Sequence, residues 1–327
     1  MHEANFRLIK NMKIAIIQLG RIGDLVLLTS AIKPIKNKFP NSKIYFIVGK
    51  SNYFVLENNP DVEKILILDK NPLKLIPFLI KFKTIKFDYY IDPKDHFSTE
   101  SNLLARIANA KIKIGFNDKN RNSKSFDIGI ASDFENKNLH FVERIGNILK
   151  HIGIYSDENI LRPSIFIDVA HQKIVNDFLQ NKDISNFILL NISASSETRM
   201  WLPEKWIALI NAIKDRKIII FSAPHHSDTV AEICSKTNAI HFPPSKLMII
   251  SVLISKSDLV ISPDTSVIHI ASAFDIPVIS LVGNISNNVV KFYPLSTKKE
   301  VILTKSKDDF VNTIEIEDVL KVYNEKF

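Results

Sequence analysis

Short apolar runs alternate with amphipathic, helix-like runs along the first half of the chain. Five apolar runs have the length and isoleucine content of buried strands. These predicted strands are Lys13–Gln18, Lys43–Val48, Glu63–Asp69, Phe87–Asp92 and Lys111–Gly115. Helix-like patterns fill the intervals, most clearly at Asp24–Lys38, Ser98–Asn109 and Leu139–Ile152. This alternation predicts parallel βαβ units, with a sheet covered on both faces.

The same alternation starts again in the second half. Its predicted strands are Asn186–Ile192, Lys217–Phe221, Asp258–Ser262, Pro277–Val282 and Val301–Thr304. Its predicted helices are Pro203–Ile213, His226–Ser235, Ser245–Ser255, Thr265–Phe274 and Ile316–Glu325. The polar, irregular segment Gly153–Pro163 is typical of a linker. We therefore predict two doubly wound parallel-sheet domains, over residues 1–160 and 161–327, a division that suits a chain of 327 residues.

The net positive charge belongs to the first half of the sequence. Residues 1–165 hold 26 Lys and Arg against 17 Asp and Glu, or +9, whereas residues 166–327 hold 17 against 18, or −1. Two interpretations remain open: an anionic partner for the first domain, or solvated lysines in a lysine-rich composition. No nucleic-acid motif accompanies the charge, so we expect no nucleic-acid partner. A phosphorylated substrate at an anionic membrane surface fits the charge as well.

Other features of composition bear on the compartment. No apolar run approaches the roughly 18 residues that span a bilayer. Cys234 is the only cysteine, which excludes an internal disulfide and a cysteine-built metal site. The first residues are polar, the apolar run after them is too short for a signal peptide, and Met12 is an alternative start to Met1. Together these features predict a cytoplasmic protein.

Asp24 is the first candidate for chemistry. It follows the strand Lys13–Gln18 and stands beside Gly20 and Gly23, in a chain with 8 glycines in all. Ligands of α/β proteins bind at the carboxyl edge of the sheet, so Asp24 is a candidate general base there. The alternative is a carboxylate that only stabilises a helix start. The two glycines lack the third glycine of a dinucleotide fingerprint.

Three strand ends in the second half are candidate ligand-binding sites. The segment 262–269 carries Asp264, Thr265, Ser266 and His269 where a helix begins, which suits an anion. The alternative is an N-capping Asp-Thr pair with a core histidine. The hydroxyl-rich loop with Ser193, Ser195 and Ser196 ends in the cation Arg199, as a diphosphate requires, although an ordinary serine-rich loop has the same composition. Gly283 ends a further strand and permits close approach of a ligand, or simply makes a turn. We expect Trp201 and Trp206 to pack against the next helix.

The remaining candidate residues give weaker evidence for a functional site. Asp92 lies at a strand end of the first domain and is a candidate for the acceptor side. Adjacent His225 and His226 are a poor metal pair, and the chain has no Asp-x-Asp triplet, so we expect no metal site. The lysine-rich apolar stretch Leu73–Phe87 fits a membrane-surface helix but more simply a helix that covers the sheet.

Taken in order, these motifs resemble glycosyltransferase family 9, the heptosyltransferase-like enzymes of lipopolysaccharide core assembly. The resemblance covers nearly the whole chain. It rests on Ile22-Gly23-Asp24, Glu57-Asn58-Asn59-Pro60, Ile114-Gly115-Phe116, Arg199-x-Trp201 with Pro203-Glu204-x-Trp206, and Asp264-Thr265-x-x-x-His269.

The resemblance implies a GT-B fold, in which two Rossmann-like domains face each other across a cleft. It implies an inverting, metal-independent transfer from a nucleotide sugar, ADP-linked in the first instance, to a phosphorylated, lipid-linked glycan acceptor. No cofactor is implied, and peripheral contact with the inner face of the cytoplasmic membrane is expected. Asp24 would be the base, Arg199 would neutralise the leaving diphosphate, Asp264 would contact the donor, and Thr265, Ser266 and His269 would hold its phosphates. The first domain would bind the acceptor and the second the donor.

Three positions depart from the family pattern. Ser266 replaces a glycine, Arg199 replaces a lysine, and Gly283-Asn284-Ile285 replaces Gly-Pro-Thr, with Ser286 as a substitute hydroxyl. These departures leave open a GT-B protein that binds a nucleotide sugar without transfer, or an epimerase. A nicotinamide oxidoreductase is disfavoured because Gly-x-Gly-x-x-Gly is missing from the sequence.

Overall fold

The computed structural model describes residues 11–94, 96, 98–116, 125–130, 138–155, 161–283, 288–306 and 309–327. The chain divides into two compact units, Met1–Phe166 (unit 1) and Ile167–Phe327 (unit 2), and each has its own sheet. The sequence predicted the boundary after residue 160, whereas the division follows Phe166.

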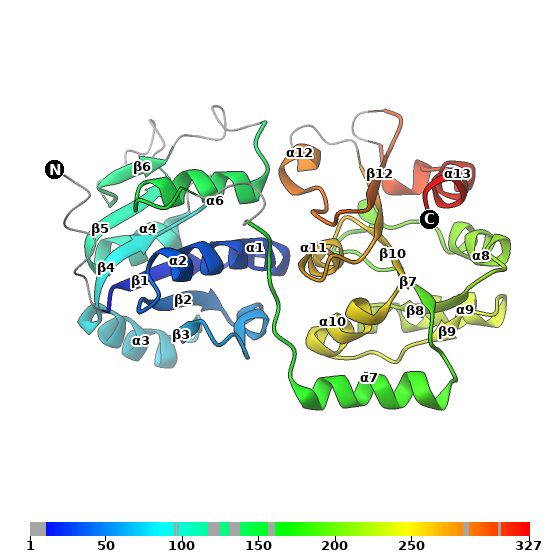
Figure 1. Cartoon of the computed structure of the whole chain (residues 1–327), viewed down its shortest axis with the longest axis horizontal. Helices are drawn as coiled ribbons and strands as arrows, with labels where there is room; N and C mark the ends of the chain where they lie inside the picture. Colours follow the sequence, from blue (N-terminus) through cyan, green and yellow to red (C-terminus); the bar gives the residue numbers. More distant parts are fainter. Residues whose placement is uncertain are drawn as a thin grey trace. The chain divides into compact units, whose positions relative to one another are not determined.

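Unit 1 is built on a six-stranded parallel sheet with the order β3-β2-β1-β4-β5-β6 (Figure 1). Lys13 to Gln18 of β1 pair in register with Lys43 to Val48 of β2 on one side, and Ile14 to Ile16 pair with Tyr89 to Ile91 of β4 on the other. The strands are β1 (Lys13–Gln18), β2 (Lys43–Gly49), β3 (Val62–Leu68), β4 (Lys86–Ile91), β5 (Asn109–Phe116) and β6 (Ile128–Ile130). The short β6 was not predicted.

Helices cover both faces of this sheet. On one face, α1 and η2 pack with α6. On the other, α3 and α4 close a core that contains Ala15 and Ile17 of β1 together with Phe82 of α3 and Leu104 of α4. The helices are α1 (Ile22–Leu28), η2 (Thr29–Ala31), α2 (Ile32–Lys38), η3 (Tyr53–Leu56), α3 (Pro72–Thr84), α4 (Thr99–Ile107) and α6 (Phe141–Lys150).

The predicted single helix Asp24–Lys38 is wrong in one respect, because a 3₁₀ turn at Thr29–Ala31 divides it. Pro34 has no amide hydrogen to donate to the carbonyl four residues earlier, and its ring crowds that carbonyl. The Thr29 hydroxyl bonds back to the carbonyl of Val26 and also accepts from the amide of Ser164 (2.8 Å). The division thus fixes α1 as a short element directly after the β1 turn.

Unit 2 repeats the topology, with the sheet order β12-β11-β10-β7-β8-β9 and all pairs parallel. Its strands are β7 (Phe187–Asn191), β8 (Lys217–Phe221), β9 (Ile240–His241), β10 (Leu259–Pro263), β11 (Val278–Val282) and β12 (Lys299–Leu303). Its helices are α7 (Val169–Asn181), η5 (Glu197–Arg199), α8 (Pro203–Ala212), η6 (Pro224–His226), α9 (Ser227–Ser235), α10 (Leu247–Lys256), α11 (Ser266–Ala273), α12 (Asn288–Phe292), η7 (Val311–Thr313) and α13 (Ile316–Lys326). The sequence reasoning missed α7, α12 and β9.

Helices again lie on both faces of the sheet. On one face, α10 packs against α7 and α11; on the other, α8 packs against α9 and α13 (Figure 1). Trp201 and Trp206 are 2% and 1% exposed and meet edge to face, with ring centroids 5.0 Å apart. The Trp201 indole donates to the carbonyl of Ile314 (2.8 Å). Both tryptophans are therefore core residues, and Trp201 packs against Trp206 of the next helix, α8, as predicted.

In each unit the chain leaves the centre of the sheet in opposite directions from two neighbouring strands, β1 and β4 in unit 1 and β7 and β10 in unit 2. Such a topological switch point is where open α/β sheets bind ligands, beyond the carboxyl ends of the strands. Both units are thus doubly wound, Rossmann-like domains, as predicted. Within the described part of the chain, none of the helices combines the length and apolarity that crossing a membrane demands.

Candidate functional site

The switch point of unit 1 carries Asp24. Residues Leu19–Arg21 link β1 to α1, and Arg21 occupies the N-cap without a capping side-chain bond. Asp24 is the acidic residue of the first turn, where the helix dipole stabilises negative charge, and it is partly exposed. Gly20 is exposed and Gly23 partly exposed on the same short segment. The strand end, the turn and the carboxylate therefore occupy the positions that the sequence predicted.

A buried asparagine holds the turn before Asp24, and sequence reasoning missed it. The Asn52 amide donates to the carbonyls of Gln18 and Gly20, both at 3.1 Å, and its side chain is fully buried. Gly49 precedes it at the end of β2, where an added Cβ would lie 2.9 Å from the carbonyl oxygen of Leu19. That distance is shorter than any ordinary contact of a Cβ atom. Only a glycine at position 49 therefore allows the end of β2 and the β1 turn to lie so close together.

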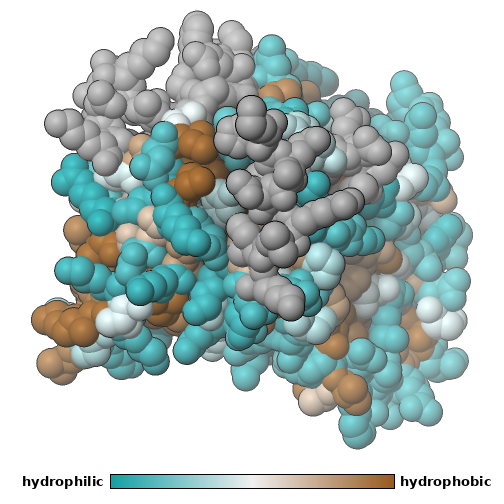
Figure 2. Space-filling view, turned by 60° about the vertical axis from the view of Figure 1, so that its left-hand side comes forward, coloured by the Kyte–Doolittle hydropathy of each residue, from teal (hydrophilic) through white to brown (hydrophobic). Residues whose placement is uncertain are grey.

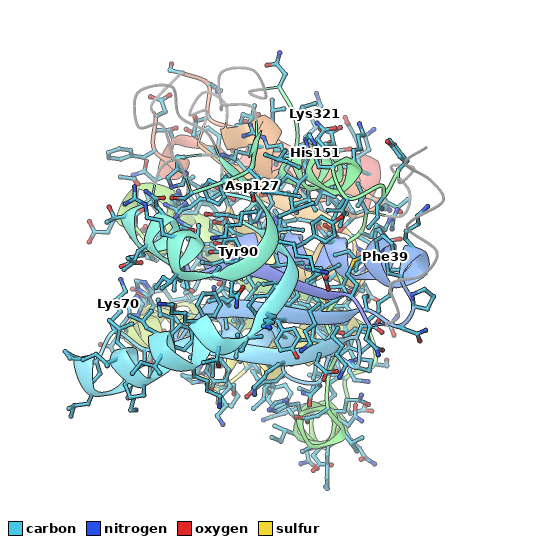
Figure 3. All side chains as sticks on the ribbon, turned by 90° about the vertical axis from the view of Figure 1, so that its left-hand side faces the viewer. Phe39, Lys70, Tyr90, Asp127, His151 and Lys321 are labelled. Carbon is cyan, nitrogen blue, oxygen red and sulfur yellow. The ribbon has the colours of Figure 1, made fainter. Side chains whose placement is uncertain are left out.

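Asp92 follows β4 across the same switch point, but it is 4% exposed. One carboxylate oxygen accepts from the Ser101 hydroxyl, and the other accepts from the backbone amide of Lys94 (3.1 Å). Burial raises the pKa of Asp92, while these two hydrogen bonds act in the opposite direction. Tyr90, which lies in the interior of unit 1 (Figure 3), has a pKa raised well above its usual range by burial and by Asp92. Asp92 is thus part of a buried polar cluster.

In unit 2 a single side chain ties the two switch-point strands together. The Asn191 amide, at the end of β7, lies within hydrogen-bond distance of the Ser262 and Thr265 hydroxyls (3.0 and 3.2 Å) and of the Ser193 carbonyl (3.0 Å). Its oxygen accepts from the amide and hydroxyl of Ser193. The loop after β7 and the helix start after β10 are therefore held in one arrangement. Asn191 is the first residue of the candidate segment 191–201, but the sequence analysis gave it no role of its own.

Arg199 and Asp264 meet at this edge. The guanidinium Nη1 lies 3.9 Å from the Asp264 carboxylate, and the two side chains are 28% and 25% exposed. Arg199 ends the 3₁₀ turn η5, while Asp264 directly follows β10 with its amide bonded to the carbonyl of Leu281. The sequence placed both residues near a donor diphosphate, and the structure brings them within ion-pair distance inside unit 2.

The start of α11 is compatible with both interpretations of this segment, an anion site and a helix N-cap followed by a core histidine. Thr265 is the N-cap, and its hydroxyl accepts from the amide of Val267 (3.3 Å). Ser266, the first helical residue, is partly exposed. His269 is 5% exposed, one turn further on, and its ring lies 6.3 Å from that of Phe292. Thr265 and Ser266 are partly exposed at the helix start, whereas His269 is mostly enclosed.

The serines of the β7 loop separate into two kinds. Ser193 is buried, and its hydroxyl accepts from the amide of Ala223 (2.9 Å). Ser195 and Ser196 are exposed, and the Ser196 hydroxyl lies 3.0 Å from that of Thr198. Gly283 follows β11 and is partly exposed, while Asn284, Ile285 and Ser286 lie outside the described residues. In the described ranges, no group of three His, Cys, Asp or Glu side chains is arranged to hold a metal ion.

The residues to which the sequence analysis gave no role share one property. Asn52, Asn191, Ser101 and Ser262 are buried polar side chains with partners in other segments of the chain. For Asn191 and Ser262, which lie in candidate segments, the available signal was a polar residue at the end of an apolar run, because a buried polar group needs a hydrogen-bond partner. Asn52 comes three residues after Gly49 and Ser101 lies within α4, so neither carried that signal. A polar residue at the end of an apolar run indicates a hydrogen bond to another segment, but the sequence does not show which segment that is.

Three comparisons with known proteins bear on this arrangement. The model of glycosyltransferase family 9 (heptosyltransferase) matches residues 79–320. The chain is 26% identical to the lipopolysaccharide core heptosyltransferase OpsX of Haemophilus influenzae, over 88% of this chain and 86% of that protein. The solved glycosyl transferase family 9 protein of Veillonella parvula is 18% identical and covers 96% of both chains with a TM-score of 0.82. The structure of E. coli heptosyltransferase WaaC with ADP is 17% identical and covers 96% of this chain and 97% of that one, with a TM-score of 0.72.

The structural likeness extends over both units and supports the predicted fold. The family match covers most of the chain, from α3 in unit 1 to α13 in unit 2. The chain therefore belongs to glycosyltransferase family 9 and is a glycosyltransferase.

Proposed function

We propose that the protein transfers heptose or a related sugar from a nucleotide sugar to a lipopolysaccharide-core or similar glycan, with inversion and without a metal ion. The observation that carries the proposal is the edge of unit 2, where Arg199, Asp264 and the start of α11 meet. Two of the relatives described above, OpsX and WaaC, are named heptosyltransferases, and the WaaC structure holds ADP. An ADP-linked heptose is therefore the first donor to test.

The chemistry follows from the groups available. Inversion is a direct displacement at the anomeric carbon: the acceptor oxygen bonds to that carbon as the bond to the diphosphate oxygen breaks. Asp24 takes the proton of the acceptor hydroxyl as its oxygen attacks. Arg199 and the backbone amides at the start of α11 stabilise the negative charge that develops on the leaving diphosphate. A guanidinium offers two parallel hydrogen bonds to phosphate oxygens, so these groups supply the neutralisation that a divalent ion provides elsewhere.

Arg199 and Asp264 have a joint role in this scheme. The Asp264 carboxylate lies 3.9 Å from the Arg199 guanidinium near the strand end. A diphosphate carries more charge than one carboxylate and competes for the same cation. Asp264 is then released to accept hydrogen bonds from donor hydroxyls. The cation is thus positioned before the donor arrives, which lowers the ordering cost of binding.

The acceptor is proposed to be phosphorylated and lipid-linked. The excess of +9 in residues 1–165 favours an anionic partner for unit 1, which we propose binds the acceptor, while unit 2 binds the donor. Such an acceptor lies in a membrane, so the enzyme works at the inner face of the cytoplasmic membrane from the cytoplasm. The scheme requires no cofactor.

The decisive experiment replaces the proposed base. Asp24→Asn keeps the size of the side chain but cannot accept the proton, so transfer should fall by about 10²-fold or more. Binding of ADP, followed by calorimetry, should stay unchanged. Asp228→Asn is the matched control, because Asp228 also lies in the first turn of a helix, α9, and is exposed.

Normal transfer by Asp24→Asn would remove Asp24 from the mechanism. Nucleotide-sugar binding by the wild type without transfer to any glycan, or interconversion of the sugar, would favour the non-transferring or epimerase alternative. A thermal-shift screen of ADP-, UDP- and GDP-sugars identifies the donor class, because a ligand that binds only the folded state raises the melting temperature.

A further inference from the structure

Helix α3 is apolar on two opposite faces. One face packs on the sheet: Phe82 is fully buried, Phe78 stacks on it with ring centroids 5.8 Å apart, and Leu75 and Leu79 contact the same core. The opposite face carries Leu73, Ile76 and Ile80, which are 84%, 60% and 66% exposed. We call these three residues the outer stripe. A helix that only covers a sheet carries polar residues on that side.

The helical repeat explains why these residues form a stripe. At about 100° per residue, Leu73, Ile76 and Ile80 fall within roughly 60° of one another on the helix surface. Figure 2 shows hydrophobic side chains interspersed with hydrophilic ones at the lower left, where α3 lies. The neighbouring helix α4 adds Leu103, which is 53% exposed. The apolar surface is therefore wider than one helix.

Lysines border the stripe on both sides. The same repeat of about 100° places Lys74 and Lys81 on one flank and Lys83 on the other. Residues 70–86 contain five lysines and neither Asp nor Glu. Acidic partners come from outside this segment, as Asp69 pairs with Lys74 (3.3 Å) and Glu100 of α4 with Lys70 (2.6 Å). Lys70 projects outward beside α3 (Figure 3). An apolar stripe between two cationic flanks is the pattern of a helix that lies in the surface of an anionic bilayer.

We propose that the outer stripe of α3 docks unit 1 onto an anionic membrane surface, with the three aliphatic side chains among the lipid tails and the lysines at the phosphates. A symmetric dimer through this face fits less well, because the lysines of segment 70–86 would meet the same lysines of the other copy. The inference extends the proposed function, since it rests on a lipid-linked acceptor as the reason for docking. The contact itself depends only on the residues of α3.

The test is co-sedimentation of the full chain with vesicles of phosphatidylcholine, alone or mixed equally with phosphatidylglycerol. The wild type should sediment with the mixed vesicles, much less with phosphatidylcholine alone, and less at high salt because salt screens the lysines. The triple variant Leu73→Gln, Ile76→Gln, Ile80→Gln should lose about tenfold or more in vesicle binding, since glutamine keeps helix propensity but removes the apolar stripe. Val169→Gln with Ile174→Gln is the matched control, because these α7 residues are 80% and 47% exposed in unit 2.

Two further measurements keep the result unambiguous. Circular dichroism should show that the triple variant is folded, and transfer to a delipidated, soluble glycan should be unchanged, so loss of docking is separated from loss of catalysis. Lys81→Glu with Lys83→Glu should also weaken binding to the mixed vesicles by about tenfold or more, given roughly 1 kcal/mol per lysine. Equal vesicle binding by wild type and triple variant would overturn the proposal. So would equal binding to both vesicle types, or a wild-type dimer in solution that the triple variant converts to monomer.

Discussion

The proposed role of Arg199 depends on the shape of its guanidinium as well as on its charge. Its guanidinium is planar and lies 3.9 Å from Asp264, at the end of the turn η5. Arg199→Met should lower kcat/KM by about 10²–10³-fold, because a preorganised group that stabilises developing charge contributes that much. Arg199→Lys should recover part of the loss, since an ammonium keeps the charge but not the paired hydrogen bonds. Steady-state kinetics with the identified donor measure both effects; equal activity of Arg199→Met and wild type would exclude Arg199 from leaving-group stabilisation.

Asp92 makes stability depend on pH. Because burial raises its pKa in the folded state above the usual value of 3.8, the folded protein binds this proton more tightly than the unfolded chain. The resulting stabilisation is complete below the unfolded pKa and is lost as pH rises through the folded pKa. Asp92→Asn has no such proton. The free energy of unfolding of the wild type minus that of Asp92→Asn should therefore decline as pH rises from about 4, and then become constant. Urea titrations across this range test it, and a difference independent of pH would contradict it.

The sequence identifies residues that combine a chemical group with a strand end. Asp264 directly follows a buried strand, while Asp24 and Arg199 lie in the segments that leave the ends of β1 and β7, so their positions near sheet edges followed from the pattern. The burial of Asp92 and His269 did not follow, because exposure depends on what the rest of the unit packs around them. The roles of Asn52 and Asn191 did not follow for a related reason, since each side chain bonds a backbone or hydroxyl group distant in sequence.

Among the elements, the β1 turn depends on the end of β2. Gly49→Ala would place a Cβ 2.9 Å from the Leu19 carbonyl, so it should lower the free energy of unfolding by about 1–3 kcal/mol and reduce transfer by moving the turn. Gly20→Ala meets only the Gln18 Oε1 at 3.6 Å, an ordinary contact. It should change stability by less than about 0.5 kcal/mol but reduce transfer if substrate approaches this backbone. Urea denaturation and transfer assays compare the pair; equal stability of the two variants would contradict the crowding at Gly49.

The longer elements were predictable, and the shorter ones were not. Strands such as Lys13–Gln18 and Lys217–Phe221 match the predicted bounds because buried parallel strands are continuous apolar runs. The strands β6 and β9 contain three and two residues, too few to show a period. The helix α7 was missed because its segment was interpreted as part of a connection between the domains. The division of the first helix depends on Pro34, whose effect on the preceding turn was not weighed.

For the whole molecule, each unit has its own sheet and its own layers of helices. Residues 167–327 alone should therefore fold cooperatively and bind the donor nucleotide, because Asn191, Arg199, Asp264 and Thr265 all belong to unit 2. Thermal unfolding with and without ADP checks this, with a higher melting temperature expected in ADP. A fragment that folds but does not bind ADP, while the full chain does, would show that unit 1 contributes to the donor site.

The architecture of two doubly wound domains followed from the repeated alternation of strands and helices. The strand order did not, because an alternating pattern is compatible with several orders and only the pairing partners distinguish them. That order is what gives the candidate residues their neighbours: β1 lies beside β4, and β7 beside β10.

The tie made by Asn191 also constrains how the donor site comes into being. Its hydroxyl partners Ser262 and Thr265 lie 71 and 74 residues further along the chain. Contacts of such long range form slowly, because closing a long loop costs entropy before the contact adds stability. During synthesis the donor edge cannot assemble until β8, β9 and β10 have all emerged from the ribosome. Nucleotide binding would then indicate that β7 and β10 of unit 2 have paired. A high nucleotide concentration would favour fully folded chains over partly folded ones.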